Sequence, residues 1–174
     1  FSNVEHFLVM SPLVEKNSNK LSESVYADLS FFESFLLYLI PSSMGVTMNL
    51  SGHLVGSDKI GHFFAEGLYY YNHFFEKGLE LKKALIYGDV ILEDQLGIGT
   101  TGIFSFGDLV ANFNGLRFWM RILKKANDPI GIFKTPYIKC VEKIWVSNEQ
   151  FDWNDYLDEG WDETKNCNHF ENQS

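Results

Sequence analysis

The expected fold depends on one stretch, Ser105-Phe-Gly-Asp108-Leu-Val-Ala-Asn112-Phe-Asn-Gly115-Leu-Arg-Phe-Trp119-Met-Arg-Ile-Leu-Lys-Lys125. At about 100° per residue this stretch predicts a helix with two faces. One face carries the cations and suits solvent; its residues are Val110, Asn114, Arg117, Arg121, Lys124 and Lys125. The other face is apolar, except that Asp108, Asn112 and Gly115 lie near its middle. A carboxylate and an amide on a buried face cost free energy unless another group pairs with them. This helix is therefore where we first expect a functional site.

Hydrophobic periodicity predicts four further helices, over residues 21–40, 58–76, 79–96 and 135–146. The last of them begins with Thr135-Pro136 as N-cap and first helical position. The helix over 79–96 is apolar on more than one side, so we expect it to be central. Alternation around Ser51-Gly52 favours a small β-hairpin near residues 46–55.

These elements predict a mainly α fold: a single-domain helical bundle of about five helices, with the hairpin as an addition. Residues 1–174 form one domain, because the length suits one core and no linker is long enough to divide the chain. Within it we expect a helical body over 1–146 and an irregular, acidic and aromatic C-terminal arm over 147–174.

The net charge of -9 is concentrated in that arm. Residues 147–174 carry eight acids and one base, a net of -7, so the other 146 residues carry -2. This balance argues against nucleic-acid binding, which needs Lys and Arg against phosphates, and gives no general attraction to anionic lipid. No apolar run approaches the ~18 residues that span a bilayer. Residue 1 is Phe rather than Met, which indicates a chain that is processed, trimmed or partial. An upstream export signal, or an anchor that brings the chain near a membrane, is compatible with this start.

The two cysteines, Cys140 and Cys167, allow one disulfide in an oxidising compartment. The alternative is a buried free thiol at Cys140, on the last predicted helix, and an incidental Cys167 in the tail. Two distant cysteines exclude a closed structural zinc site. The sequence also has no Gly-x-Ser-x-Gly elbow for a serine nucleophile.

Asp58 and His62 are the first candidate site residues. They are four residues apart on a predicted helix, so the carboxylate could orient the imidazole or share a metal with it. The alternative is an exposed ion pair, because both residues lie opposite the main apolar arc of that helix.

Glu93 is the second candidate, with Asp89 one turn before it. A carboxylate on a central helix is a candidate general base or metal ligand. A buried ion pair with Lys82 explains the same residues equally well.

Asp108 and Asn112 are the third candidate pair. The pattern Ser105-x-x-Asp108 fits a capping box, in which Asp108 bonds back to the start of the helix. Capping does not explain Asn112, one turn deeper on the same face.

The arm offers a fourth candidate region, around Trp161-Asp162-Glu163 and Asn166. Acids beside tryptophan in a tail are more often a solvated arm than a site. Its aromatic residues Trp153, Tyr156 and Trp161 suit an interaction surface, because interfaces are enriched in aromatic side chains.

Three elements recur together: Asp58-Lys-Ile-Gly-His62, then Glu93, then Ser105-Phe-Gly-Asp108-Leu-Val-Ala-Asn112-Phe-Asn-Gly115. This combination resembles a pattern shared by VanZ-like proteins and a group of uncharacterised bacterial periplasmic lipoproteins. The resemblance covers about residues 57–118. It implies an α-helical bacterial protein of the periplasm or outer envelope, and it nominates Asp58, His62, Glu93, Asp108, Asn112 and Gly115 as site residues.

Two functions follow as hypotheses. The first is a structural or interaction subunit of an envelope assembly, with a protein partner and a buried Asp/His/Glu/Asn network. The second is a hydrolase acting on an envelope lipid or cell-wall fragment, either metal-dependent or by acid–base chemistry. Its catalytic candidates are Asp58, His62, Glu93, Asp108 and Asn112, and a divalent metal would take His62, Glu93 and Asp108 as ligands.

Overall fold

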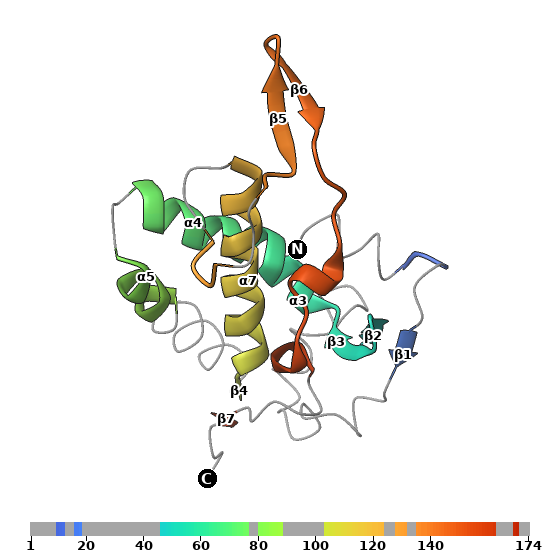
Figure 1. Cartoon of the computed structure of the whole chain (residues 1–174). Helices are drawn as coiled ribbons and strands as arrows, with labels where there is room; N and C mark the ends of the chain where they lie inside the picture. Colours follow the sequence, from blue (N-terminus) through green and yellow to red (C-terminus); the bar gives the residue numbers. More distant parts are fainter. Residues whose placement is uncertain are drawn as a thin grey trace.

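A computed structural model describes residues 10–12, 16–18, 46–76, 80–88, 103–123, 128–131, 135–162 and 169–170. Its centre is helix α7, Phe106–Leu123, which confirms the helix predicted from the opening stretch. Helices α4 and α5 lie on one side of α7, and strands β2 and β3 lie on the other (Figure 1). Among the residues that the structure describes, none of the helices combines the length and hydropathy needed to span a membrane.

The predicted helix over 58–76 is confirmed, but it contains a π-helical turn. It runs through α3 (Asp58–Gly61), the π turn η2 (His62–Glu66) and α4 (Gly67–Glu76). The indole nitrogen of Trp119, on α7, donates a hydrogen bond of 2.9 Å to the Phe64 carbonyl of the π turn. Such turns interrupt the regular helical bonding and occur often at functional sites.

Two glycines bring this helix and α7 into close contact. A Cβ added at Gly115 would lie 1.9 Å from the carbonyl oxygen of Phe63, and one added at Gly67 would lie 2.5 Å from the backbone of Gly115. Only residues without side chains let the two backbones approach this closely. Gly115, which the resemblance nominated, therefore fixes the distance between the helices that carry the candidate residues.

The predicted hairpin near 46–55 is confirmed as β2 (Val46–Leu50) and β3 (His53–Gly56), joined through Ser51 and Gly52 at positive φ. Strand β1 (Lys16–Ser18) adds to β2, giving an antiparallel sheet in the order β1-β2-β3. A two-stranded pair of β4 (Ile103–Phe104) and β7 (His169–Phe170) lies at the start of α7.

The prediction of a five-helix bundle is wrong. Residues 135–146, predicted as a helix, instead carry an antiparallel hairpin of β5 (Ile138–Val141) and β6 (Ile144–Ser147). Valine, isoleucine and tryptophan on both sides of the turn favour strands. The turn residues Glu142 and Lys143 both have positive φ, 50° and 68°, where glycine or asparagine is usual, so neither residue type indicates a turn here. In the described residues the fold combines three helices (58–76, α5 and α7) with antiparallel hairpins.

Helix α5 spans Leu81–Gly88, which confirms the first part of the helix predicted over 79–96. The described part of α5 is peripheral rather than central, because Lys82, Lys83 and Ile86 are exposed. The central position belongs to α7. Lys82 therefore points to solvent, which does not suit the buried ion pair considered for it.

The stretch from Phe151 was predicted as a short helix plus an arm laid on the body, and the described part of the arm, residues 147–162, does pack against the body with aromatic side chains in the core. Of two short 3₁₀ helices, η5 (Glu159–Trp161) packs beside α7 and β3. The other, η4 (Trp153–Asp155), places the Trp153 ring 5.1 Å from that of Phe63. Trp161 is fully buried, and its indole nitrogen donates to the Tyr156 carbonyl at 2.9 Å. The two join a core cluster whose other buried members are Val55, Phe63, Ala111, Phe118, Tyr137 and Leu157.

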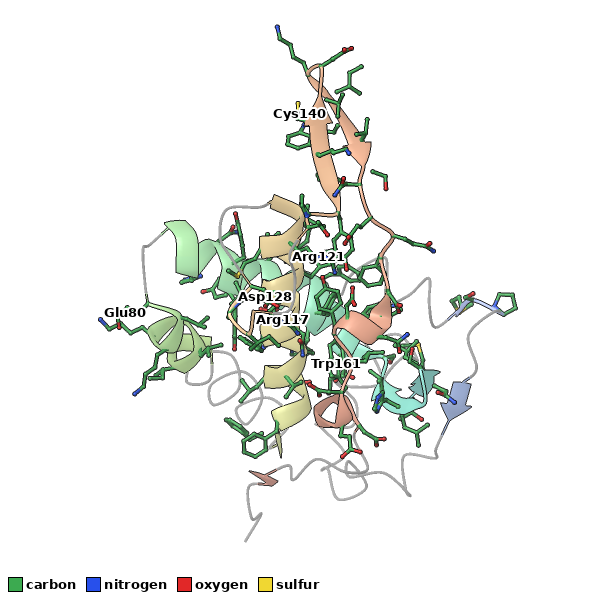
Figure 2. All side chains as sticks on the ribbon, viewed as in Figure 1. Glu80, Arg117, Arg121, Asp128, Cys140 and Trp161 are labelled. Atoms are coloured by element: carbon green, nitrogen blue, oxygen red, sulfur yellow. The ribbon has the colours of Figure 1, made fainter. Side chains whose placement is uncertain are left out.

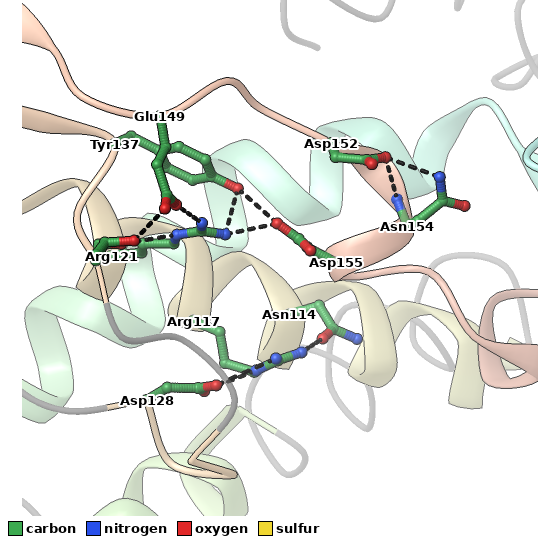
Figure 3. Close-up of polar contacts among 10 residues, drawn as sticks. Asn114, Arg117, Arg121, Asp128, Tyr137, Glu149, Asp152, Asn154 and Asp155 are labelled. Atoms are coloured by element: carbon green, nitrogen blue, oxygen red, sulfur yellow. Dashed lines mark hydrogen bonds and ion pairs between the residues drawn. The ribbon is translucent and has the colours of Figure 1, made fainter.

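The cationic face of α7, predicted to be solvated, is buried by the chain that follows it (Figure 3). Arg117 is buried and donates to both carboxylate oxygens of Asp128, at 2.9 and 3.3 Å. Arg121 bonds to Asp155 at 2.6 Å and to Glu149. Acids of the arm thus pair with arginines of the helix, and this pairing covers a face that periodicity alone assigned to water.

Several predictions fall outside the described residues. They are the helix over 21–40, the end of the helix over 79–96, and the residues Asp89, Glu93, Glu163, Asn166 and Cys167. Cys140 is described: it is a free thiol, exposed on strand β5 rather than buried on a helix. Figure 2 shows it on the projecting hairpin, far from the core residue Trp161.

Candidate functional site

The candidate site lies where the start of helix α3 meets the first turns of α7. Lys59 is buried there, and its ammonium lies between two carboxylates. Its Nζ is 2.8 Å from Asp58 Oδ2 and 2.5 Å from Asp108 Oδ1. The lysine therefore joins an acid of its own helix to an acid of α7, and it satisfies the charge that the sequence placed on a buried face.

His62 extends this cluster toward a second residue of α7. Its Nε2 is 3.4 Å from Asp108 Oδ2, and its Nδ1 is 3.0 Å from Asn112 Oδ1. An amide oxygen accepts, so Nδ1 carries the proton in this contact and Nε2 faces the Asp108 carboxylate. The His62 imidazole thus contacts both Asp108 and Asn112, the two polar side chains on the predicted apolar face of α7.

Ser105 shows that the capping interpretation was correct in one respect. Its Oγ accepts a hydrogen bond of 3.2 Å from the Asp108 amide, as an N-cap residue does. The Asp108 carboxylate, however, contacts Lys59 and His62 on the neighbouring helix. Capping positions the backbone of Asp108, while its side chain belongs to the cluster.

The pKa of the Asp58 carboxyl lies below its ordinary value. Burial opposes this shift, but the positive charge of Lys59, that of His62 and the hydrogen bond from Lys59 outweigh it. Asp58 is therefore ionised at neutral pH. By formal charge, the two carboxylates and the ammonium leave the cluster at -1 before His62 is counted.

The cluster is open to solvent on one side only. The side chains of Asp58, His62 and Asp108 are 38%, 26% and 13% exposed, while Lys59 and Asn112 are buried behind them. A small polar ligand or ion can therefore reach the carboxylates and the imidazole. The arrangement can bind a cation, exchange a proton at His62, or fix the two helices in register.

The structure brings together four of the five residues predicted as catalytic: Asp58, His62, Asp108 and Asn112. The fifth, Glu93, is outside the described residues. Sequence reasoning missed Lys59, although it is the second residue of the Asp-Lys-x-x-His element. Its placement beside an acid made it look like an ordinary solvated cation.

The residues predicted as an interaction surface occupy a different environment. Trp161 and Tyr156 are core residues, and Trp153 is half-buried with its ring 5.1 Å from that of Phe63. Their rings are part of the core rather than an exposed contact surface.

Comparison with models of protein families, with curated proteins and with solved structures found no match for this chain.

Proposed function

We propose that this chain is an interaction subunit of a bacterial envelope assembly, and that hairpin β5–β6 contacts its partner. Support for the envelope comes from the resemblance of residues 57–118 to VanZ-like proteins and periplasmic lipoproteins. Support for interaction comes from one observation, the exposed apolar surface of the hairpin. The polar cluster between α3 and α7 would then hold the scaffold that presents it.

The hairpin projects from the body (Figure 1). Large apolar side chains are exposed at its end. Ile144 is 66% exposed, Trp145 is 69% exposed and Val141 is 45% exposed. In the antiparallel register Val141 pairs with Ile144 and Cys140 with Trp145. Successive pairs face opposite sides of a hairpin, so both sides carry apolar groups. Several large apolar side chains exposed together at the end of one hairpin are typical of an interaction site, whereas scattered single residues are not.

The backbone of the hairpin offers the means of recognition. Within the described residues, β5 and β6 pair only with each other, so each strand has an outer edge of unpaired amides and carbonyls. A partner's extended segment can add to such an edge as a third strand. Lys139 and Lys143 against Glu142 give the hairpin a local charge of +1 on an acidic chain. We expect the partner segment to alternate apolar side chains with a carboxylate near these lysines.

The base of the hairpin is fixed to helix α7. Arg121 donates to the Thr135 carbonyl at 3.1 Å and to the Tyr137 hydroxyl at 2.9 Å, and its guanidinium lies 4.0 Å from the Tyr137 ring centroid. Just after strand β6, the backbone N–H of Asn148 donates to the Tyr137 carbonyl at 2.7 Å. An isolated two-stranded hairpin is marginally stable, so this anchor is what lets the protein present it in one orientation.

The test compares two exposed apolar sites in cells that express the full chain. One variant is Ile144→Ser with Trp145→Ser on the hairpin, and the matched control is Ile86→Ser on α5, where the isoleucine is also exposed. We expect the native chain and the control to elute from gently solubilised envelopes as a complex larger than the monomer, and the hairpin variant to elute alone. Alkylation of the Cys140 thiol should be slower in the complex than in the purified chain.

Elution of the hairpin variant in the same complex would exclude β5–β6 as the contact. Elution of the native chain as a monomer would exclude the interaction role itself.

The contacts of His62 favour a second candidate function, acid–base hydrolysis of an envelope lipid or cell-wall fragment. The partly exposed imidazole lies between a buried amide and a carboxylate, which suits a general base. Purified chain should then hydrolyse such substrates, and His62→Ala should remove the activity. Equal turnover by the two proteins would exclude this function.

A further inference from the structure

Three side chains of the candidate site have the geometry of a metal centre. Asp58, His62 and Asp108 each offer one ligand atom, and these atoms lie within 4.8 Å of one another. They come from two elements, the helical segment 58–66 and α7, which the Gly67–Gly115 contact holds at a fixed distance. We propose that these three residues bind one divalent transition-metal ion, Mn²⁺ or Zn²⁺. The proposal requires neither of the two functions above.

The donor set selects the class of ion. Two carboxylates and one imidazole favour a first-row transition metal, because Ca²⁺ and Mg²⁺ prefer sites made of oxygen alone. Three protein ligands leave at least one coordination position open to water or substrate. All three side chains reach solvent in part, so an ion can enter without unfolding the helix pair.

Lys59 is compatible with a bound ion because each carboxylate has two oxygens. The ammonium contacts Oδ2 of Asp58 and Oδ1 of Asp108. The other oxygen of Asp108 lies 3.4 Å from His62 Nε2, and the ion pair with Lys59 uses one of the two oxygens of Asp58. Lysine in this position orients both ligands from the outer shell, as hydrogen bonds to ligating carboxylates do at metal centres. Two carboxylates against one ammonium leave one net negative charge to attract a divalent cation when the imidazole is neutral, as metal ligation requires.

Asn112 is an independent observation that supports a ligand at this position. It is fully buried, and its Oδ1 is 3.0 Å from His62 Nδ1. Ligating histidines commonly donate their second ring N–H to an oxygen in this way, which fixes the ring and turns the other nitrogen toward the ion. The Asn112 Nδ2 has no hydrogen-bond partner within the described residues, so it can donate to a ligand of the ion.

The first experiment titrates the purified full chain with Mn²⁺ and, separately, with Zn²⁺ by calorimetry. We expect one ion per chain, with binding at least tenfold weaker in His62→Ala and in Asp108→Asn. Glu142→Gln removes a carboxylate from the hairpin tip and should bind as the native chain does. Because Zn²⁺ also binds thiols, the comparison is repeated in a background with both Cys140→Ser and Cys167→Ser, where the result should not change.

Equal affinity in the native chain and both site variants would overturn the proposal. So would the absence of binding of both Mn²⁺ and Zn²⁺ at about 1 mM, a concentration near the weak end of protein metal sites. A second measurement avoids variants that fail to fold: in the native chain, Mn²⁺ should broaden the NMR signals of the His62 ring at lower concentration than those of His53. Simultaneous broadening of both rings would show binding that is not at this site. Neither metal-binding experiment depends on hairpin β5–β6, so failure of the metal proposal can be distinguished from failure of the interaction proposal.

Discussion

The contact between α3 and α7 and the hairpin β5–β6 distribute polar and apolar groups in opposite ways. At the helix contact a lysine, a histidine, an asparagine and two aspartates are gathered, the lysine pairing with both aspartates and the histidine with the asparagine and one aspartate. At the hairpin, isoleucine and tryptophan face water. Folding normally buries apolar side chains and leaves charged and polar side chains in water. Each exception needs a separate explanation: mutual pairing satisfies the polar groups inside, and a partner would cover the apolar groups outside.

The two regions also differ in what an amino-acid substitution should cost. The helix contact is close-packed around two glycines, so a change of one methyl group is felt by the whole fold. The hairpin is supported only at its base, so its tip can change without consequence for the body. Four predictions use this difference, from the largest expected effect to the smallest.

Gly115→Ala should have the largest effect, with loss of the folded state. The new methyl would lie 1.9 Å from the Phe63 carbonyl oxygen, so the helices must separate. Overpacking commonly costs about 1–3 kcal/mol and more where backbone must move. The matched control is Gly160→Ala, whose nearest neighbours are side-chain atoms at 3.0 Å or more. Circular dichroism and urea unfolding measure both. Equal stability of the two variants would show that the helices are not held at this distance.

The same truncation at two tryptophans separates the regions directly. Trp161→Ala removes a fully buried ring and should cost about 3–5 kcal/mol of unfolding free energy. Trp145→Ala removes an exposed ring and should change that free energy by less than about 0.5 kcal/mol. Urea denaturation of the two variants gives both values. A large loss in Trp145→Ala would mean that the hairpin is part of the core.

Arg117→Met should cost about 3 kcal/mol or more, because it leaves the Asp128 carboxylate buried without its partner. The double variant with Asp128→Leu should recover much of that loss, since neither charge then remains. Urea unfolding of the two single variants and the double variant measures the coupling. Additive losses would show that this ion pair does not hold residues 128–131 on α7.

The smallest effect should be a change in pH dependence at Glu149. Hydrogen bonds from Thr135 and then from Arg121 hold the pKa of this carboxyl below its ordinary value. The unfolded chain therefore binds the proton first as pH falls, at about 4.3. The contribution of Glu149 to stability is present above that pH and is lost as pH falls through the lower folded pKa. Urea unfolding at pH 6 and between pH 5 and 3 should show that the native chain loses its advantage over Glu149→Gln. A difference in unfolding free energy between the native chain and Glu149→Gln that does not change with pH would show that the pKa of Glu149 is not lowered by folding.

How much could be predicted from the sequence differs between the same two regions. Long periodic segments gave α7, the helix over 58–76 and the hairpin at Ser51-Gly52. That Asp108 and Asn112 contact other polar groups could also be predicted, because polar residues on an apolar face must find partners. Asp58 and His62 lie opposite the main apolar arc of their own helix, so this reason does not identify them as the partners. The role of Lys59 could not, since helical spacing does not say that a lysine will be buried between two acids.

The second hairpin and the covered face of α7 depend on tertiary contacts. Glu142 and Lys143 are poor turn residues, so no turn signal divides residues 135–146, and Thr135-Pro136 indicated the start of a helix. The β-branched and aromatic residues beside the turn form the hairpin through their cross-strand pairs. Arg117 and Arg121 are ordinary surface residues by type. They are covered because Asp128, Glu149 and Asp155 return to pair with them from later in the chain. No local pattern encodes a pairing across that distance.

The central claim is that the polar groups of the two helices meet, and a double-mutant cycle on His62→Ala and Asp108→Asn tests it most directly. Urea unfolding of the native chain, the two single variants and the double variant gives the coupling energy. Groups in contact should be non-additive by about 0.5 kcal/mol or more, and distant groups add within about 0.3–0.5 kcal/mol. We predict a coupling of about 1 kcal/mol. Strict additivity would mean that the imidazole and the carboxylate do not meet, and it would contradict both the polar cluster and the metal site built on it.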